Sequence, residues 1–118
     1  MSNPFWYLQL HTPDAARARA FYRQMFGWAI TEDPADAAAY AEIDAGEGPG
    51  GGVLQVPGGP AQWLPFVRVD DAAAAVEQAR RLGAAVVLAP VSVAGKGTYA
   101  VIDDPTGASF AVWQPLAP

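Results

Sequence analysis

The residues best suited to chemistry lie near the start of the chain, at every second position of an otherwise apolar stretch. Tyr7, Gln9 and His11 alternate with large apolar residues across residues 5–11, and this alternation predicts a strand with two different faces. His11 is the single histidine of the chain, and the pKa of an imidazole suits a general base. A capping or surface role for His11 and a packing role for Tyr7 are the alternatives.

Two later stretches combine aromatic and polar side chains in the same way. Phe66 and Arg68 share one face of a strand predicted over residues 63–69, and a last strand is predicted over residues 109–114. Large flat rings with a few directional polar groups are typical of small-molecule pockets, although packing in the core or in a dimer interface is the alternative. Arg68 can hold a carboxylate, stack on an aromatic ring or remain solvated. The predicted ligand-binding residues are Tyr7, Gln9, His11, Phe66, Arg68, Ser109 and Trp113.

Glu42 is a further group that can transfer a proton. It lies with Tyr40 on a strand predicted over residues 39–44, where it can act as a base, attract a cation or simply be solvated. The candidate catalytic residues are therefore His11, Tyr7 and Glu42. The stretch EGPGGG at residues 47–52 lacks the Lys and the Ser or Thr of a phosphate loop. We expect these glycines to allow a tight hairpin or a close approach to a ligand.

The composition narrows the classes of partner and cofactor. The net charge is −5 over 118 residues, which argues against nucleic acid or an anionic membrane as a partner, because both need clustered Lys and Arg. The chain has no cysteine and one histidine, which excludes disulfides, thiolate metal sites and any metal site with two histidines from one chain. The opening residues lack a basic region and a long apolar run, so we expect no signal peptide and a cytoplasmic location.

Two helices must position these strands. The stretch TPDAARARAFYRQMFGW at residues 12–28 has the spacing of a helix with one buried face. Thr12 or Asp14 can cap its start, and Gly27 can end it in a left-handed conformation. A second helix is predicted over residues 70–82, followed by Gly83. The predicted inner faces consist of Ala18, Phe21, Tyr22 and Met25 in the first helix, and of Ala72, Ala75, Val76, Ala79 and Leu82 in the second.

The order of elements repeats after a Pro-Gly-rich break at residues 57–60. A shift of 56 residues places Asp14 on Asp70 and Gly27 on Gly83. Further strands are predicted over residues 28–32, 53–56, 85–88 and 98–102, with a turn at Asp33-Pro34. We therefore predict an α+β fold in a single domain, residues 1–118. It consists of two tandem βαβββ modules, about 4–57 and 62–116, that form a concave, mostly antiparallel sheet with the helices on the outer face.

These features resemble the glyoxalase/bleomycin-resistance/extradiol-dioxygenase superfamily, also called vicinal oxygen chelate proteins. The resemblance rests on the paired modules, on ARAFYRQMFGW and on DPTGASFAVWQP. It implies metal ligands at the positions of Tyr7, Leu64 and Ala111, with a fourth near residues 50–54. Because leucine and alanine cannot ligate a metal, the resemblance implies that the usual metal site is absent, and with it the usual lyase, isomerase or dioxygenase chemistry.

The sequence leaves three functions open. The first is a metal-free small-molecule binding protein of the bleomycin-resistance type, without a cofactor, that holds an aromatic or partly cationic ligand in a cleft. The second is an enzyme of the same fold with an atypical or absent metal, and the third is a structural or regulatory module. We expect a homodimer, with the cleft formed either within one chain or across two.

Overall fold

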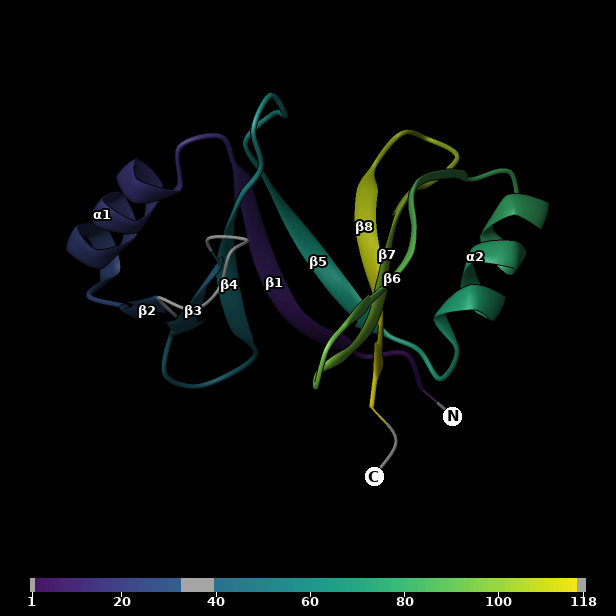
Figure 1. Ribbon diagram of the computed structural model, residues 1–118, viewed down its shortest axis with the longest axis horizontal. Helices are drawn as coiled ribbons and strands as arrows, with labels where there is room; N and C mark the ends of the chain where they lie inside the picture. The colour runs from purple at the N-terminus through teal and green to yellow at the C-terminus, as the bar shows by residue number, and fades with distance from the viewer. Residues whose placement is uncertain (1, 33–39, 117–118) are drawn as a thin grey trace. The chain divides into compact units, whose positions relative to one another are not determined.

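The computed structural model describes residues 2–32 and 40–116, which contain ten helices and strands (Figure 1). The α+β class and the predicted order β-α-β-β-β, twice over, are confirmed. The predicted Asp33-Pro34 turn lies outside the described residues. The elements are β1 (Phe5–Thr12), α1 (Ala15–Phe26), β2 (Ala29–Glu32), β3 (Tyr40–Asp44), β4 (Gly50–Gln55), β5 (Gln62–Arg68), α2 (Ala72–Arg81), β6 (Ala85–Val93), β7 (Gly97–Asp103) and β8 (Ser109–Pro115).

The chain divides into two compact units. Tyr7–Leu64 form the first, called here the N-terminal unit. The second, called the C-terminal unit, begins at Pro65 and also contains the described residues up to Trp6. The division into modules of residues 4–57 and 62–116 within one domain stays a prediction.

In the N-terminal unit the strands lie in the order β2-β3-β4-β1, and α1 packs on one face of them (Figure 1). β1 and β4 are parallel, whereas β2 with β3 and β3 with β4 are antiparallel. The alternation of large apolar residues therefore builds a core on the helix side. Its buried members are Leu10, Ala15, Ile30, Ala41, Ile43 and Val53.

The buried face of α1 differs from the predicted one. Ala15 is buried, and Ala18 and Tyr22 pack against the core, whereas Phe21 is 55% exposed and Met25 is also exposed. Successive residues are about 100° apart around a helix, so Phe21 lies a quarter turn from Tyr22 and leaves the contact. The apolar spacing fits two overlapping helical faces, and packing against the strands selects the one that contains Ala15.

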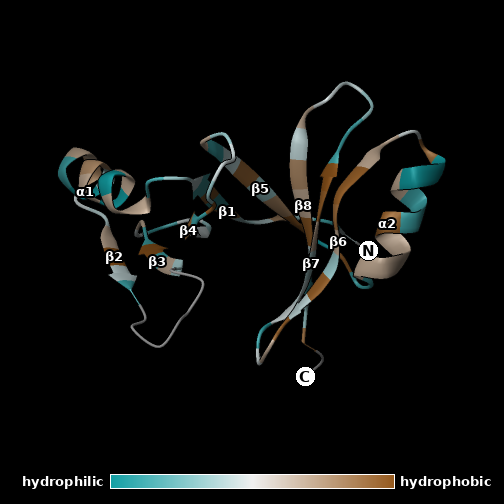
Figure 2. Ribbon diagram, turned by 45° about the horizontal axis from the view of Figure 1, so that its top comes forward, coloured by the Kyte–Doolittle hydropathy of each residue, from teal (hydrophilic) through white to brown (hydrophobic). Residues whose placement is uncertain are grey.

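The C-terminal unit repeats this plan with the strand order β5-β8-β7-β6. β5 and β8 are parallel, and β8 with β7 and β7 with β6 are antiparallel, so the predicted mostly antiparallel pairing is confirmed within each unit. Figure 2 shows brown along part of β7, and α2 with both teal and brown segments, as expected for a helix with one buried face. The core consists of Ala72, Val76, Ala100, Ile102 and Val112.

Two predicted boundaries need correction. β6 extends to Val93 rather than ending at Leu88, and it follows β7 through two register shifts, which obscure the period of two in the sequence. The C-terminal residue of the predicted α2 face, Leu82, is exposed because α2 ends at Arg81.

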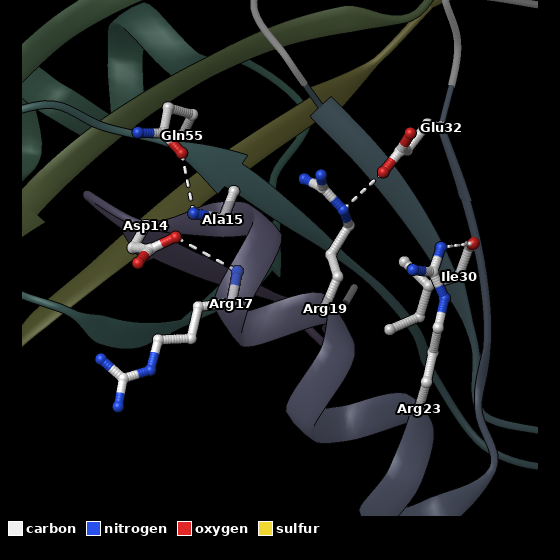
Figure 3. A network of polar contacts seen from close by, with 8 residues as sticks. All are labelled: Asp14, Ala15, Arg17, Arg19, Arg23, Ile30, Glu32 and Gln55. Atoms are coloured by element: carbon white, nitrogen blue, oxygen red, sulfur yellow. Dashed lines mark hydrogen bonds and ion pairs between the residues drawn. The ribbon is translucent and has the colours of Figure 1, made fainter.

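Each helix starts with the same pair of hydrogen bonds. Asp14 Oδ1 accepts from the backbone N–H of Arg17 (3.1 Å), and Gln55 Oε1 accepts from that of Ala15 (2.7 Å) (Figure 3). These bonds satisfy two of the free N–H groups at the helix start, and Gly27 ends the helix with a φ of 70°.

In α2 the corresponding acceptors are Asp71 Oδ1, for Ala74 N–H (3.1 Å), and Gln114 Oε1, for Ala72 N–H (2.8 Å). The cap is therefore Asp71 and not Asp70. The repeat offset is 57 residues at the helix starts, although the glycines that follow the helices keep the predicted offset of 56. Among the described residues, no helix is long and apolar enough to cross a membrane.

Candidate functional site

The sheet face of the N-terminal unit that lies opposite α1 carries most of the predicted chemistry. Paired residues form rows across β1, β4 and β3. One row consists of Gln9, Gly52 and Glu42, and the row two residues further along β1 consists of His11, Leu54 and Tyr40. Neighbouring residues in these rows project to the same side of a sheet, and the alternate residues Leu10, Val53 and Ala41 belong to the core under α1. We call this surface the polar face. It consists of Tyr7, Gln9, His11, Tyr40, Glu42, Gly52 and Leu54.

The polar face contains a hydrogen-bonded pair, His11 and Gln9. His11 Nε2 lies 2.6 Å from Gln9 Oε1, which is possible because residues two apart in a strand share a face. Gln9 is only 7% exposed and His11 is half-buried. Burial lowers the pKa of His11 below its usual value of 6.5, because the charged imidazolium loses hydration. His11 is therefore a neutral imidazole at pH 7.

Tyr40 lies directly over Gly52. A Cβ added to Gly52 would occupy the place of the Tyr40 ring and hydroxyl, so only glycine lets the ring lie against the strand. Tyr40 was not among the predicted site residues, although a glycine inside a strand is a signal for such a close approach. The close approach that we predicted for the EGPGGG glycines is thus made here by a side chain of the same unit.

The two other predicted catalytic candidates lie on the same face. Glu42 is exposed in the row of Gln9 and Gly52. Tyr7 is half-buried and pairs with Gly50. It lies two residues before Gln9 in β1, whereas His11 lies two residues after it. The structure therefore places Tyr7, His11 and Glu42 on one surface of one unit.

The remaining predicted ligand-binding residues belong to the C-terminal unit. Phe66 pairs with Ala111, and Arg68 pairs with Trp113, on the face opposite α2. Phe66 is 1% exposed and Trp113 is 9% exposed. The ring centroids of Phe66 and Tyr99 are 6.0 Å apart, and burial raises the pKa of Tyr99.

Arg68 and Ser109 already have partners in this unit. The guanidinium carbon of Arg68 lies 5.7 Å from the centre of the Trp6 ring, and its Nη1 lies 3.5 Å from Asp70 Oδ1. Arg68 thus contacts both an aromatic ring and a carboxylate of its own unit, and its role as a ligand contact stays a prediction. Ser109 Oγ donates to Asp103 Oδ1 (2.5 Å). A single ligand surface that combines residues of both units stays a prediction.

Arginine side chains of α1 contact β2 within the N-terminal unit (Figure 3). Arg23 Nη2 donates to the Ile30 carbonyl (2.6 Å), and Arg19 Nε lies 2.6 Å from Glu32 Oε1. The side chain of Arg19 is largely buried here, although Arg19 is not part of the predicted inner face of the first helix. These contacts hold β2, which supports β3 with Tyr40 and Glu42.

The side chains present do not fit a metal of the kind that the resemblance implies. Leu64 and Ala111, at two of the three implied positions, are buried hydrocarbon side chains and cannot donate electrons to a divalent ion. Within residues 2–32 and 40–116, no group of three or more His, Cys, Asp or Glu side chains could hold a metal ion.

Comparison with known proteins identifies relatives over nearly the whole chain. A family model described as a glyoxalase-like domain matches residues 7–113. The anthracycline biosynthesis protein DnrV of Streptomyces peucetius is 34% identical over 131 residues, which cover 94% of this chain and 46% of DnrV. The putative glyoxylase CFP32 of Mycobacterium tuberculosis is 34% identical over 112 residues, covering 91% of this chain and 42% of CFP32. The chain thus spans about half the length of the curated relatives it matches.

Solved structures agree on the fold. Methylmalonyl-CoA epimerase from Mycobacterium tuberculosis superimposes with a TM-score of 0.65 over 95% of this chain and 87% of the epimerase, at 16% identity. Identity this low shows a shared fold and leaves the activity open. The family match and the two relatives show that the chain belongs to the glyoxalase-like domain family, within the glyoxalase/bleomycin-resistance/extradiol-dioxygenase superfamily, and the shared fold agrees with this.

Proposed function

We propose that this chain is a small-molecule binding protein that holds an aromatic or partly cationic ligand on the polar face, without a metal or another cofactor. The observation that carries the proposal is the arrangement of Tyr40 over Gly52 beside the His11–Gln9 pair. It combines a flat ring with a half-buried neutral imidazole, and such mixtures bind flat organic molecules. Phe66, Arg68, Ser109 and Trp113 stay predicted ligand contacts.

The charge of the chain supports the cationic part of this proposal. Glu42 is exposed on the polar face, and the net charge is −5, so the field of the protein favours a ligand with an amine. The relative DnrV is named as an anthracycline biosynthesis protein. An anthracycline such as daunomycin is a flat polycyclic compound with an amine and is therefore a suitable first ligand.

Calorimetric titration with daunomycin, followed by mass spectrometry of the recovered compound, tests this function. We expect saturable binding, unchanged daunomycin and a higher melting temperature, since a hundredfold excess over Kd adds about 2.7 kcal/mol of stability. Glu42→Gln should weaken binding, whereas Glu47→Gln, which removes an exposed acid of the β3–β4 loop, should not. Absence of binding to daunomycin and to a panel of smaller aromatic amines would refute the proposal.

An enzyme is the second candidate, because burial keeps His11 neutral and able to accept a proton. It would transfer protons with His11, Tyr7 or Glu42. Formation of a product that disappears in His11→Ala, also at ligand concentrations that saturate the variant, would favour this candidate over binding alone.

We also propose a homodimer, since twofold dimers are the commonest oligomers. Light scattering behind a sizing column should give twice the mass of the chain, and a monomer at micromolar concentration would contradict it. The cytoplasmic location stays a prediction.

A further inference from the structure

The His11–Gln9 contact determines which nitrogen of the imidazole carries the proton. The atom of Gln9 that faces His11 Nε2 at 2.6 Å is the amide oxygen, Oε1. An amide oxygen can only accept a hydrogen bond, so Nε2 must donate. A neutral imidazole has one N–H, and Nδ1 therefore carries the lone pair.

The surroundings leave Nδ1 available. Among residues 2–32 and 40–116, Gln9 is the one hydrogen-bond partner that the structure gives the His11 ring. The neighbours of His11 in its row are Leu54, which is aliphatic, and Tyr40, whose hydroxyl lies against Gly52 on the middle strand. Glu42 shares the polar face but lies two strands and two residues away from His11, which is about 12 Å between the two Cα atoms at the usual strand geometry.

We propose that His11 Nδ1 accepts a hydrogen bond from a hydroxyl on the ring of the bound ligand, and that Gln9 is the positioning residue that holds the imidazole in this tautomer. The inference rests on the proposed function, because it names the class of ligand that the polar face selects. That class is aromatic compounds with a free hydroxyl, such as phenols and naphthols. Their methyl ethers have the same ring but no donor.

The half-buried position of His11 against the buried Gln9 makes this selection effective. A buried acceptor that loses its donor pays its desolvation without compensation, which lowers affinity by about tenfold or more. Gln9 is itself almost fully buried, so water is a poor substitute for its amide oxygen as the acceptor of the Nε2 proton.

The test uses 1-naphthol and 1-methoxynaphthalene with the chain of 118 residues. Because His11 is the single histidine, the two imidazole nitrogen signals in a ¹⁵N spectrum must come from His11. We expect Nε2 to be protonated in the free protein, Nδ1 to shift when 1-naphthol binds, and 1-methoxynaphthalene to bind at least about tenfold more weakly.

Gln9→Leu removes the acceptor, and Gln24→Leu makes the same change at an exposed position of α1. Gln9→Leu should give a mixture of the two imidazole tautomers and lower the affinity for 1-naphthol about three- to tenfold, with little change for 1-methoxynaphthalene. Gln24→Leu should match the wild type in both. A purely structural role of Gln9 would lower both affinities equally.

The outcomes separate the two proposals. Equal affinities of the wild type for the two compounds, or an Nδ1-protonated His11, would overturn the inference and leave ligand binding on the polar face in place. Failure of 1-naphthol to bind would overturn the inference, and absence of binding to daunomycin and to the panel of smaller aromatic amines as well would overturn both. The wild-type comparison needs no variant, so it decides the inference even if Gln9→Leu does not fold.

Discussion

The side chain of Gln55, at the end of β4, holds the first residue of α1, because its Oε1 accepts the Ala15 backbone N–H at 2.7 Å. Gln114, at the end of β8, holds Ala72 in α2 in the same way. A glutamine on the strand beside each helix start thus completes the cap that the aspartate begins. This pair of contacts is the clearest sign of the internal repeat, and it involves residues about 40 positions apart.

Gln55→Ala should lower the free energy of unfolding by about 1 kcal/mol, the usual cost of an N-terminal cap. Gln114→Ala should cost a similar amount, because the contact is equivalent. Urea denaturation measures both, with Gln24→Ala on the exposed side of α1 as the control. Values for the two variants that match the control would show that the glutamines contribute nothing to capping.

Gly52→Ala should displace Tyr40 from the polar face. The added Cβ would collide with the Tyr40 ring, and such overpacking costs about 1–3 kcal/mol. Gly50→Ala is the matched control, because a Cβ there meets nothing closer than a carbonyl oxygen at 3.9 Å. Urea denaturation of the single variants and of Gly52→Ala with Tyr40→Ala forms a double-mutant cycle. Additive free energies in that cycle would contradict the contact.

The stability of the fold should fall as the pH drops below about 6.5. Burial lowers the pKa of His11 in the folded state relative to its usual value of 6.5, so between these two values the unfolded chain binds more protons and gains stability. Well above pH 6.5 both states are neutral at this residue and the contribution vanishes. Unfolding free energies measured from pH 8 to pH 5 should show a smaller decline in His11→Gln than in the wild type. Identical curves would refute this linkage.

Leu64→Ala should be far more costly than Leu82→Ala. Leu64 is 1% exposed and Leu82 is 66% exposed, and removing a buried leucine costs about 2–5 kcal/mol, whereas an exposed one costs about 0.5 kcal/mol or less. Thermal or urea denaturation of the two variants compares the same chemical change at two depths. A small effect of Leu64→Ala would mean that this position is not part of a packed core in solution.

Added Zn²⁺, Ni²⁺, Mn²⁺ or Fe²⁺ should leave the melting temperature unchanged, and elemental analysis of the purified protein should find no stoichiometric metal. The reason is that Leu64 and Ala111 occupy two of the positions at which the superfamily resemblance implies ligands. One tightly bound metal per chain in the wild type would contradict the metal-free proposal.

Local patterns were sufficient to predict much of this protein. The period of 3.6 located both helices, the period of two located most strands, and the glycines after the helices and in the β3–β4 loop marked the turns, because these signals arise within a few neighbouring residues. The same alternation placed Tyr7, Gln9 and His11 on one face of β1. The family followed from the order of these elements and from two short motifs.

Contacts between distant residues settled what the pattern left open. Packing on the strands selected Ala15, rather than Phe21 and Met25, for the buried face of α1. The register of β1, β4 and β3 brought His11, Tyr40 and Glu42 to one surface and set Tyr40 over Gly52. Strand pairing is decided by burial and hydrogen bonding across the sheet rather than along the chain. For that reason the position of Tyr40 over Gly52 could be found only from the tertiary structure.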